Sequence, residues 1–180
     1  MSVVVGIDPG PTRSAWATYP DRREPWEPLK IRAGIVATSE IYHHLPDLYG
    51  AEIAIEMIAS YGMPVGREVF ETCVWIGRLI EQCARASSRG REPALVYRKD
   101  VKLHICGSPK AKDGNIRQAL IDRFGPPGTK KSPGVTYGLA GDMWQALAVA
   151  VYHHDTAAAA RPPLAPPEVA VALLGGEGAG

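Results

Sequence analysis

The chain has 180 residues, which suffices for one domain with a full hydrophobic core and excludes two domains of ordinary size. Its 20 lysine and arginine residues balance 19 aspartate and glutamate residues, so net charge does not by itself indicate a polyanionic partner. The sequence has no apolar run near the about 18 residues of a membrane span, no signal peptide and no CxxC spacing among its three cysteines. We therefore expect a one-domain cytoplasmic protein without a membrane partner.

The N-terminal part of the chain predicts three strands. Residues 3–7 form an apolar run typical of a strand buried on both faces, and Asp8 follows directly before a Pro-Gly turn. Residues 14–20 and 29–37 are two further candidate strands, separated by a charged turn with two prolines. We expect these two segments to extend the first strand as an antiparallel hairpin.

The middle of the chain adds a fourth strand and a long helix. A short helix is expected within residues 39–50, and residues 51–57 are a strand that ends near a second acid, Glu56. Apolar residues at helical spacing predict an amphipathic helix over residues 66–86.

The C-terminal part is mostly helical. Residues 94–97 are the fifth strand, and helices are predicted over 99–107, 114–124 and 141–154. The glycine- and proline-rich residues 125–139 predict a loop. This order indicates an α/β fold with a five-stranded mixed sheet flanked by helices. The folded domain is expected to span residues 1–155, and residues 156–180 a low-complexity, disordered tail.

Three acids in this pattern are candidates for one site. Asp8 and Glu56 end the first and fourth strands, which would be neighbours in a mixed sheet, and Asp142 begins the last helix. No base adjacent in the sequence would neutralise them, so the cluster is costly unless a cation fills it. Oxygen ligands favour Mg²⁺, with Mn²⁺ also possible, and two such ions about 4 Å apart support phosphodiester hydrolysis. The pattern therefore predicts a nuclease site.

Each acid also has a plainer interpretation. Asp8 could cap the following turn, Glu56 could be a solvated strand end paired with Arg67, and Asp142 could serve only as a helix N-cap.

Four ordered segments carry a family resemblance: GIDPG with Asp8, AIEM with Glu56, KAKDGNIRQAL, and GDMWQALAVAVYHH with Asp142. Over residues 3–154 the chain resembles the RuvC-type Holliday junction resolvases of the ribonuclease H-like superfamily, particularly their phage-like relatives. GIDPG alone is a weak signal, because actin-like kinases also place a glycine-rich turn after a first strand, but this chain is too short for their two domains and has no second phosphate-binding glycine loop.

The resemblance implies a homodimer that binds a four-way DNA junction and makes paired, metal-dependent nicks, in a bacterial cell or a phage-infected host. It places the metal ligands on Asp8, Glu56 and Asp142. Family members often carry a further ligand three residues after the position of Asp142, and here that position is Gln145. An amide can bind Mg²⁺ but cannot neutralise it. Asp113 is a candidate fourth acid, or else the N-cap of the helix that follows it.

Basic residues cluster in two segments that flank the proposed site. They are either solvated charges or phosphate contacts, and the resemblance favours DNA, with Lys112 also implied as a catalytic residue that steadies transition-state charge. Arg98, Lys99 and Lys102 precede these segments. The DNA-binding candidates are Lys110, Lys112, Arg117, Lys130, Lys131, Arg67 and, as a wedge that unstacks bases, Tyr61.

Two further alternatives stay open at this point. The apolar face of helix 66–86 either packs on the sheet or, as the resemblance implies, forms the dimer interface. The protein is either a structure-selective endonuclease or, because Gln145 weakens the second metal site, a catalytically weakened junction-binding protein of the same fold.

Overall fold

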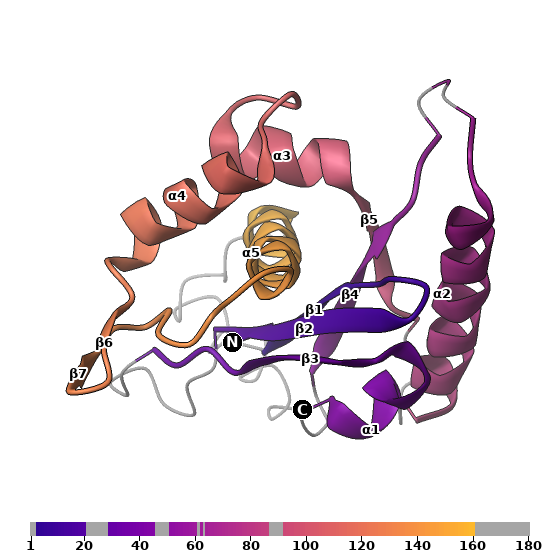
Figure 1. Ribbon diagram of the computed structural model, residues 1–180, viewed down its shortest axis with the longest axis horizontal. Coiled ribbons are helices and arrows are strands. Elements are labelled where there is room, and N and C mark those ends of the chain that lie inside the picture. The colour runs from indigo at the N-terminus through magenta and orange to yellow at the C-terminus, as the bar shows by residue number, and fades with distance from the viewer. Residues whose placement is uncertain are drawn as a thin grey trace, which may run out of the picture.

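The computed structural model describes residues 3–20, 29–45, 51–60, 62, 64–86 and 92–160. Its centre is a five-stranded sheet in the order β3-β2-β1-β4-β5 (Figure 1). Strands β1, β2 and β3 are antiparallel, whereas β4 lies parallel to both β1 and β5. The predicted mixed sheet is therefore confirmed. The strands are β1 (Val4–Asp8), β2 (Arg13–Tyr19), β3 (Ala33–Ala37), β4 (Glu52–Met57) and β5 (Ala94–Tyr97).

Helices cover both faces of the sheet. The short elements η1 and α1 and the long helix α2 lie on one side, and α5 lies on the other, between the sheet and an arc formed by α3 and α4 (Figure 1). The helices are η1 (Thr38–Glu40), α1 (Ile41–His44), α2 (Arg67–Ala86), α3 (Arg98–Cys106), α4 (Asp113–Phe124) and α5 (Met143–Ala160). None of the described helices has the length and apolar character needed to cross a membrane.

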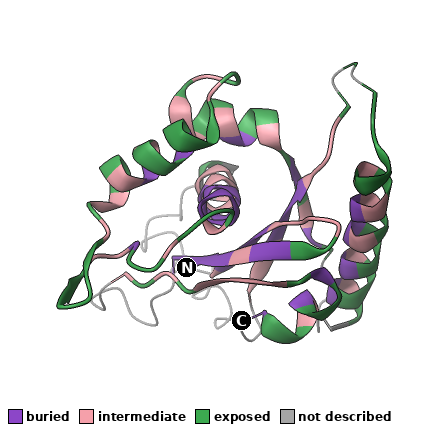
Figure 2. Cartoon of the chain, in the orientation of Figure 1, coloured by how far each residue is buried: buried purple, intermediate pink, exposed green. Residues whose placement is uncertain are grey.

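Helix α5 is the central core element. Residues 144–151 are all buried, as a helix packed between two layers requires (Figure 2). Gly6 of β1 lets α5 approach the sheet, because a Cβ at Gly6 would collide with the carbonyl oxygen of Ala146 and the amide of Ala150. At the start of β4, the His153 ring of α5 lies 3.1 Å from the Glu52 carboxylate. This register runs α5 back across the sheet, so that its N-terminus lies toward the end of β1.

Asp155 joins the layer of α3 and α4 to α5. Its carboxylate accepts hydrogen bonds from Arg123 of α4 at 2.6 and 3.0 Å and lies 2.9 Å from His104 of α3. Arg123 also donates to the Tyr19 hydroxyl at the end of β2, at 3.2 Å. These contacts fix the arc of α3 and α4 over α5 at the end of the sheet away from Asp8.

Three sequence-based predictions need correction. Helix α5 continues to Ala160, five residues into the predicted tail, because residues 157–160 are alanines, the strongest helix formers. Residues 161–180 lie outside the described residues. The predicted loop 125–139 contains a small hairpin of β6 (Gly128–Thr129) and β7 (Ser132–Pro133), in which Gly128 supplies a positive φ. Finally, α4 begins at Asp113 rather than Gly114, and its N-cap residue is Lys112.

Candidate functional site

Asp8 and Glu56 occupy adjacent positions on neighbouring parallel strands. Ile7 of β1 pairs with Ile55 of β4, so the next residue on each strand is an acid at the same edge of the sheet. Even-numbered residues of both strands face α5, as Gly6 and Glu52 show by their contacts with that helix. The two carboxylates therefore share the face of the sheet that α5 covers.

The turn after Asp8 is held by a small hydrogen-bond network. Thr38, at the end of β3, donates to the Gly10 carbonyl oxygen at 2.9 Å, and its hydroxyl lies 2.9 Å from that of Ser14. Ser14 in turn accepts a hydrogen bond from the Gly10 amide at 3.3 Å. The buried Thr38 and Ser14 thus satisfy the backbone of the Pro-Gly turn and fix the direction in which β1 ends.

Asp8 lies in a strongly acidic environment. Its burial, together with the nearby negative charges of Glu56, Asp142 and Asp113 and against the opposing effect of Arg98, raises its pKa from 3.8 to about 7. The carboxylates of Glu56, Asp142 and Asp113 thus lie near enough to Asp8 to oppose its negative charge. Asp142 is exposed at the N-cap position of α5, where its carbonyl oxygen accepts the Gln145 and Ala146 amides.

Arg98 is the positive charge in this cluster. It is the first residue of α3, directly after Tyr97 of β5, which pairs with Met57 of the neighbouring strand. One guanidinium nitrogen donates to Glu56 at 2.9 Å and another to Asp113 at 2.6 Å. Burial disfavours the charged Arg98, but the carboxylates of Glu56, Asp113 and Asp8 more than compensate and raise its pKa. The acids have no neutralising base adjacent in the sequence, as expected, but the fold brings them one from a distant segment.

The partners of Glu56 and Asp113 exclude two plainer interpretations. Glu56 is buried and pairs with Arg98, whereas Arg67 pairs with Glu71 on its own helix at 2.6 Å. Asp113 is bonded to Arg98 and also lies 3.9 Å from Lys102, so it is part of the acidic site rather than an N-cap. Asn115 accepts a hydrogen bond from the Lys112 amide at 2.9 Å and completes the start of α4.

The donor chemistry suits a divalent cation, but the present arrangement does not close around one. Carboxylate oxygens are the ligands that Mg²⁺ and Mn²⁺ prefer. Within the described ranges, however, no three His, Cys, Asp or Glu side chains are placed so that they could hold a metal ion. Arg98 instead bridges two of the four acids. Gln145 is buried in the first turn of α5.

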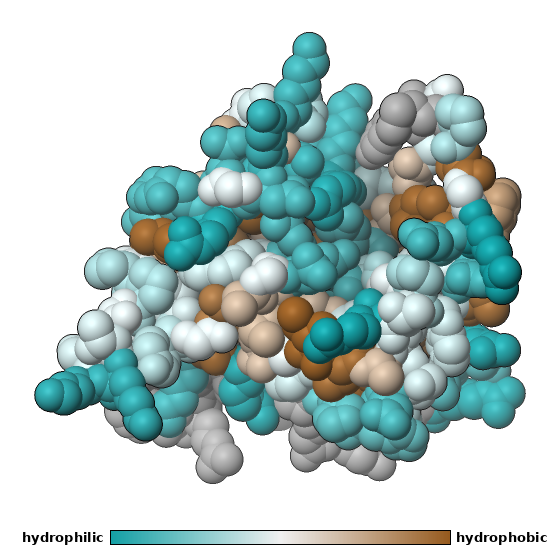
Figure 3. Space-filling view, viewed as in Figure 1, coloured by the Kyte–Doolittle hydropathy of each residue, from teal (hydrophilic) through white to brown (hydrophobic). Residues whose placement is uncertain are grey.

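The basic candidates separate into two groups. Lys110 and Lys112 are exposed in the segment before α4, next in sequence to the anchored Asp113, and hydrophilic residues gather over α3 and α4 (Figure 3). Arg117 is exposed on α4 and stacks over the Trp144 ring at 5.3 Å. Lys130 and Lys131 form the turn of the β6–β7 hairpin.

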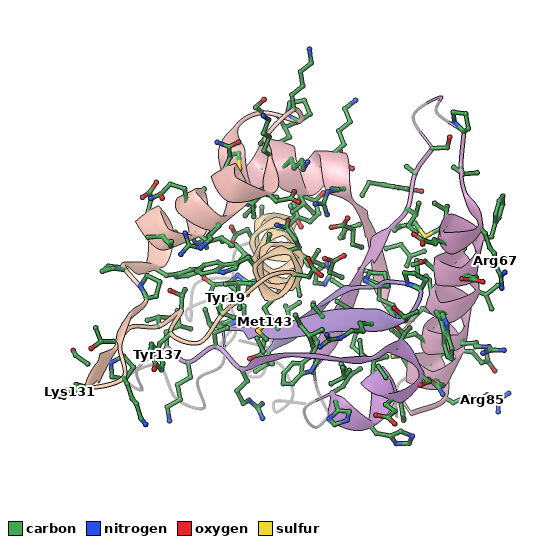
Figure 4. The ribbon with its side chains drawn as sticks, in the orientation of Figure 1. Tyr19, Arg67, Arg85, Lys131, Tyr137 and Met143 are labelled. Atoms are coloured by element: carbon green, nitrogen blue, oxygen red, sulfur yellow. The ribbon has the colours of Figure 1, made fainter. Side chains whose placement is uncertain are left out.

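Arg67 and Tyr61 are not part of either group. Arg67 lies at one end of the molecule and Lys131 at the other (Figure 4), and a DNA-binding role for Arg67 stays a prediction. Tyr61 lies outside the described residues.

Arg98 is the site residue that the sequence analysis missed. It was grouped with Lys99 and Lys102 as a basic residue before the DNA-binding segments. Its role follows from the parallel register of β4 and β5: Val96 is the register partner of Glu56, and Arg98, two residues further along, reaches the Glu56 carboxylate.

Solved structures share this architecture. The structure of Thermus thermophilus RuvC matches with a TM-score of 0.59 at 19% sequence identity, covering 87% of this chain and 96% of that chain. The T. thermophilus RuvC in complex with Holliday junction substrate matches with a TM-score of 0.57 at 17% identity, covering 87% of this chain and 95% of that chain. This chain has the ribonuclease H-like fold of RuvC.

The RuvC fold confirms the fold that the four sequence segments implied. No family model matches the chain, and no curated protein sequence matches it. At sequence identities of 17% and 19%, the structural similarity supports the same fold but does not establish the same activity. The assignment to a phage-like branch stays a prediction.

Proposed function

We propose that this protein is a structure-selective endonuclease that hydrolyses phosphodiester bonds in branched DNA with a divalent metal ion. One observation carries the proposal: in a RuvC fold, Asp8 is buried at the end of β1 beside the acids Glu56, Asp142 and Asp113, and this burial together with their negative charge raises its pKa to about 7. Clustered carboxylates repel one another and the phosphates of a nucleic acid. A bound divalent cation removes this repulsion and can take part in phosphodiester hydrolysis. The T. thermophilus relative has been solved with a Holliday junction substrate, which makes a four-way junction the first substrate to test. We place this activity in the cytoplasm of a bacterial cell or a phage-infected host.

Asp8, Glu56 and Asp142 are the residues that would hold Mg²⁺ or Mn²⁺, with Asp113 and Gln145 as neighbours. A bound ion would supply an activated water and stabilise the leaving oxygen. The protein's own part is to hold these carboxylates at one rigid edge: β1 and β4 fix Asp8 and Glu56 through their ladder, and the buried α5 fixes Asp142. The Lys112 ammonium group, at the N-cap of α4, is proposed to stabilise negative charge on the scissile phosphate.

The exposed lysines are proposed to position DNA through its phosphates. Lys110 and Lys112 are close in sequence to the anchored Asp113, and Arg117 follows on α4. The turn of the β6–β7 hairpin adds Lys130 and Lys131. Contacts of this kind fix the register of a duplex without reading its sequence, which suits an enzyme that selects structure.

We propose that the outer face of α2 is the interface of a homodimer. Thr72, Ile76 and Leu79 face the sheet and are buried, whereas Phe70 and Val74 remain 61% and 56% exposed. One helix thus carries two apolar faces, of which the described residues cover only one. Paired nicks in a four-way junction require two sites related by two-fold symmetry, which a dimer provides.

The decisive experiment compares junction cleavage by the wild type and by Asp8→Asn. A labelled four-way junction, a linear duplex of the same sequence and a single fork are incubated with Mg²⁺ or Mn²⁺. We expect symmetric nicks in the junction alone, and loss of cleavage at least ~10²-fold in Asp8→Asn with unchanged or tighter binding, because a charge that repels phosphates is removed. Retained cleavage in this variant, or equal cleavage of the linear duplex, contradicts the proposal.

A second candidate function is junction binding without efficient cleavage. Two observations favour it: Arg98 occupies the acidic cluster, and the neutral Gln145 is buried where a further acid would add charge. The same assay separates the two candidates, because a junction-binding protein shifts the labelled junction on a native gel and leaves every strand intact in both metals.

A further inference from the structure

We propose that Arg98 acts as an internal cation that competes with a divalent metal ion for Glu56. The inference rests on the proposed function, since it concerns the regulation of the same acidic site. It assigns to Arg98 a positioning role: the residue keeps the site in a closed, metal-free form and sets the metal concentration at which the site becomes occupied.

The first argument is geometric. The guanidinium of Arg98 spans two acids from different elements, Glu56 of β4 and Asp113 of α4, at 2.9 and 2.6 Å. The planar fork of arginine is suited to bridging carboxylates in this way, and both bonds are charge-assisted. While these bonds persist, at least one oxygen of Glu56 is committed to a ligand other than a metal ion.

Burial strengthens the contact with Glu56. The Glu56 side chain is 11% exposed and that of Arg98 33%, whereas that of Asp113 is 61% exposed. A carboxylate as buried as Glu56 requires a compensating cation, because leaving it unpaired would cost the desolvation energy of the charge. Arg98 meets this need in the metal-free protein, and a metal ion would meet the same need in its place.

Repulsion between the two cations opposes the binding of both at Glu56. Asp8, Glu56, Asp113 and Asp142 contribute four acidic groups, and Arg98 is flanked by the further cation Lys102, 3.9 Å from Asp113. A divalent ion placed at Asp8 and Glu56 would stand beside the guanidinium and repel it. The two states are therefore exclusive at Glu56, and Arg98 stays tied to the site through Asp113.

Replacement of Arg98 by a metal ion at Glu56 would also affect the segment before α4 that carries Lys110 and Lys112. Asp113 begins α4 and directly follows Lys112, so the Arg98–Asp113 bond fastens this segment to the ends of β4 and β5. When Arg98 leaves Glu56, its remaining bond to Asp113 can move with the start of α4. Metal occupancy and the position of Lys110 and Lys112 are thereby coupled.

The test is metal binding without DNA. Titration calorimetry with MnCl₂ compares the wild type, Arg98→Gln, Arg98→Lys and the control Arg85→Gln. The control removes the same charge from an exposed pair with Glu81 on α2. We expect Arg98→Gln to bind Mn²⁺ about tenfold or more tightly than the wild type, because no charge-assisted bond must be broken. Arg98→Lys should show a smaller gain, and Arg85→Gln none.

The outcomes separate the inference from the proposed function. If Arg98→Gln binds Mn²⁺ with wild-type or weaker affinity, the competition is disproved while the metal site stands. If none of the four proteins binds Mn²⁺, both the inference and the metal-dependent function are wrong. Asp8→Asn should abolish the heat of binding in both the wild-type and Arg98→Gln backgrounds, and persistence of that heat would place the ion elsewhere and overturn the inference. If circular dichroism shows that Arg98→Gln does not fold, the Mn²⁺ affinity of Arg98→Lys is the test instead. An affinity equal to that of the wild type would then overturn the inference.

Discussion

Among the acids of the site, Asp8 is the one whose pKa the folded environment changes most. Burial, together with the neighbouring charges of Glu56, Asp142 and Asp113, raises its pKa to about 7, whereas the unfolded chain would titrate near 3.8. The folded protein therefore binds a proton at Asp8 that the unfolded chain has already lost between these two pH values. By linkage, the free energy of unfolding falls as pH rises through this window.

The corresponding prediction is a pH-dependent stability that Asp8→Asn removes in part. In the absence of divalent metal, the wild-type melting temperature should fall between pH 5 and pH 8. Asp8→Asn should be more stable than the wild type at pH 8, and the difference should shrink at pH 5, because the wild-type carboxyl group is then largely protonated. Calorimetric melting at the two pH values measures both effects. Parallel curves for the two proteins would mean that the fold does not raise the pKa of Asp8.

Gln145 gives a second prediction at the residue scale. Its side chain is 5% exposed at the first turn of α5, so Gln145→Asp would bury a charge beside an already acidic site. The metal-free variant should be destabilised by roughly 1–3 kcal/mol relative to the wild type. If residue 145 reaches the metal shell, Mg²⁺ should restore more stability to the variant than to the wild type and support cleavage at lower concentration. Superimposable Mg²⁺ titrations would place residue 145 outside that shell.

At the scale of elements, the contact between β1 and α5 positions the acids. Gly6 brings the α5 backbone against the strand, and this contact fixes how far Asp142 lies from Asp8 along the sheet. The alanines of α5, at positions 146, 148 and 150, keep the approach close because their side chains are small.

Gly6→Ala should therefore destabilise the fold and disturb the site. The new Cβ would collide with backbone atoms of Ala146 and Ala150, which cannot rotate away, so we expect a loss of at least about 1–3 kcal/mol of unfolding free energy. Gly114→Ala is the matched control, since a Cβ there meets open space on α4 and should be neutral or stabilising by up to about 1 kcal/mol. Urea unfolding measures both. Equal stability of the two variants would show that α5 does not depend on Gly6.

At the scale of the whole molecule, α2 and the acids Asp8 and Glu56 lie on opposite faces of the sheet. Helix α2 packs on the face of the sheet opposite α5 (Figure 1), and its apolar residues Phe70 and Val74 are exposed. A homodimer through this face would leave the edge with Asp8 and the surface of α3 and α4 free for DNA.

We predict that charge on the outer face of α2 separates the dimer without unfolding the subunit. Phe70→Glu together with Val74→Glu should convert a micromolar dimer into a monomer by light scattering, because both side chains are more than half exposed in the single chain. The melting temperature extrapolated to low protein concentration should change little, and junction nicking should lose its paired character. A wild type that is monomeric both alone and on DNA contradicts the dimer.

The sequence by itself determined the elements of this protein and the location of its acids on them. Apolar runs and helical periodicity placed five strands and the main helices, and Asp8 and Glu56 were correctly expected at adjacent strand ends, because local patterning encodes which residues a strand buries. Only the tertiary structure decided what surrounds those acids. Arg98 is 42 residues from Glu56 and 15 from Asp113, and nothing local distinguishes it from the basic residues beside it. Its role depends on the parallel register of β4 and β5 and on the docking of α4, and such contacts between distant segments are set by packing of the complete core rather than by any short stretch of sequence.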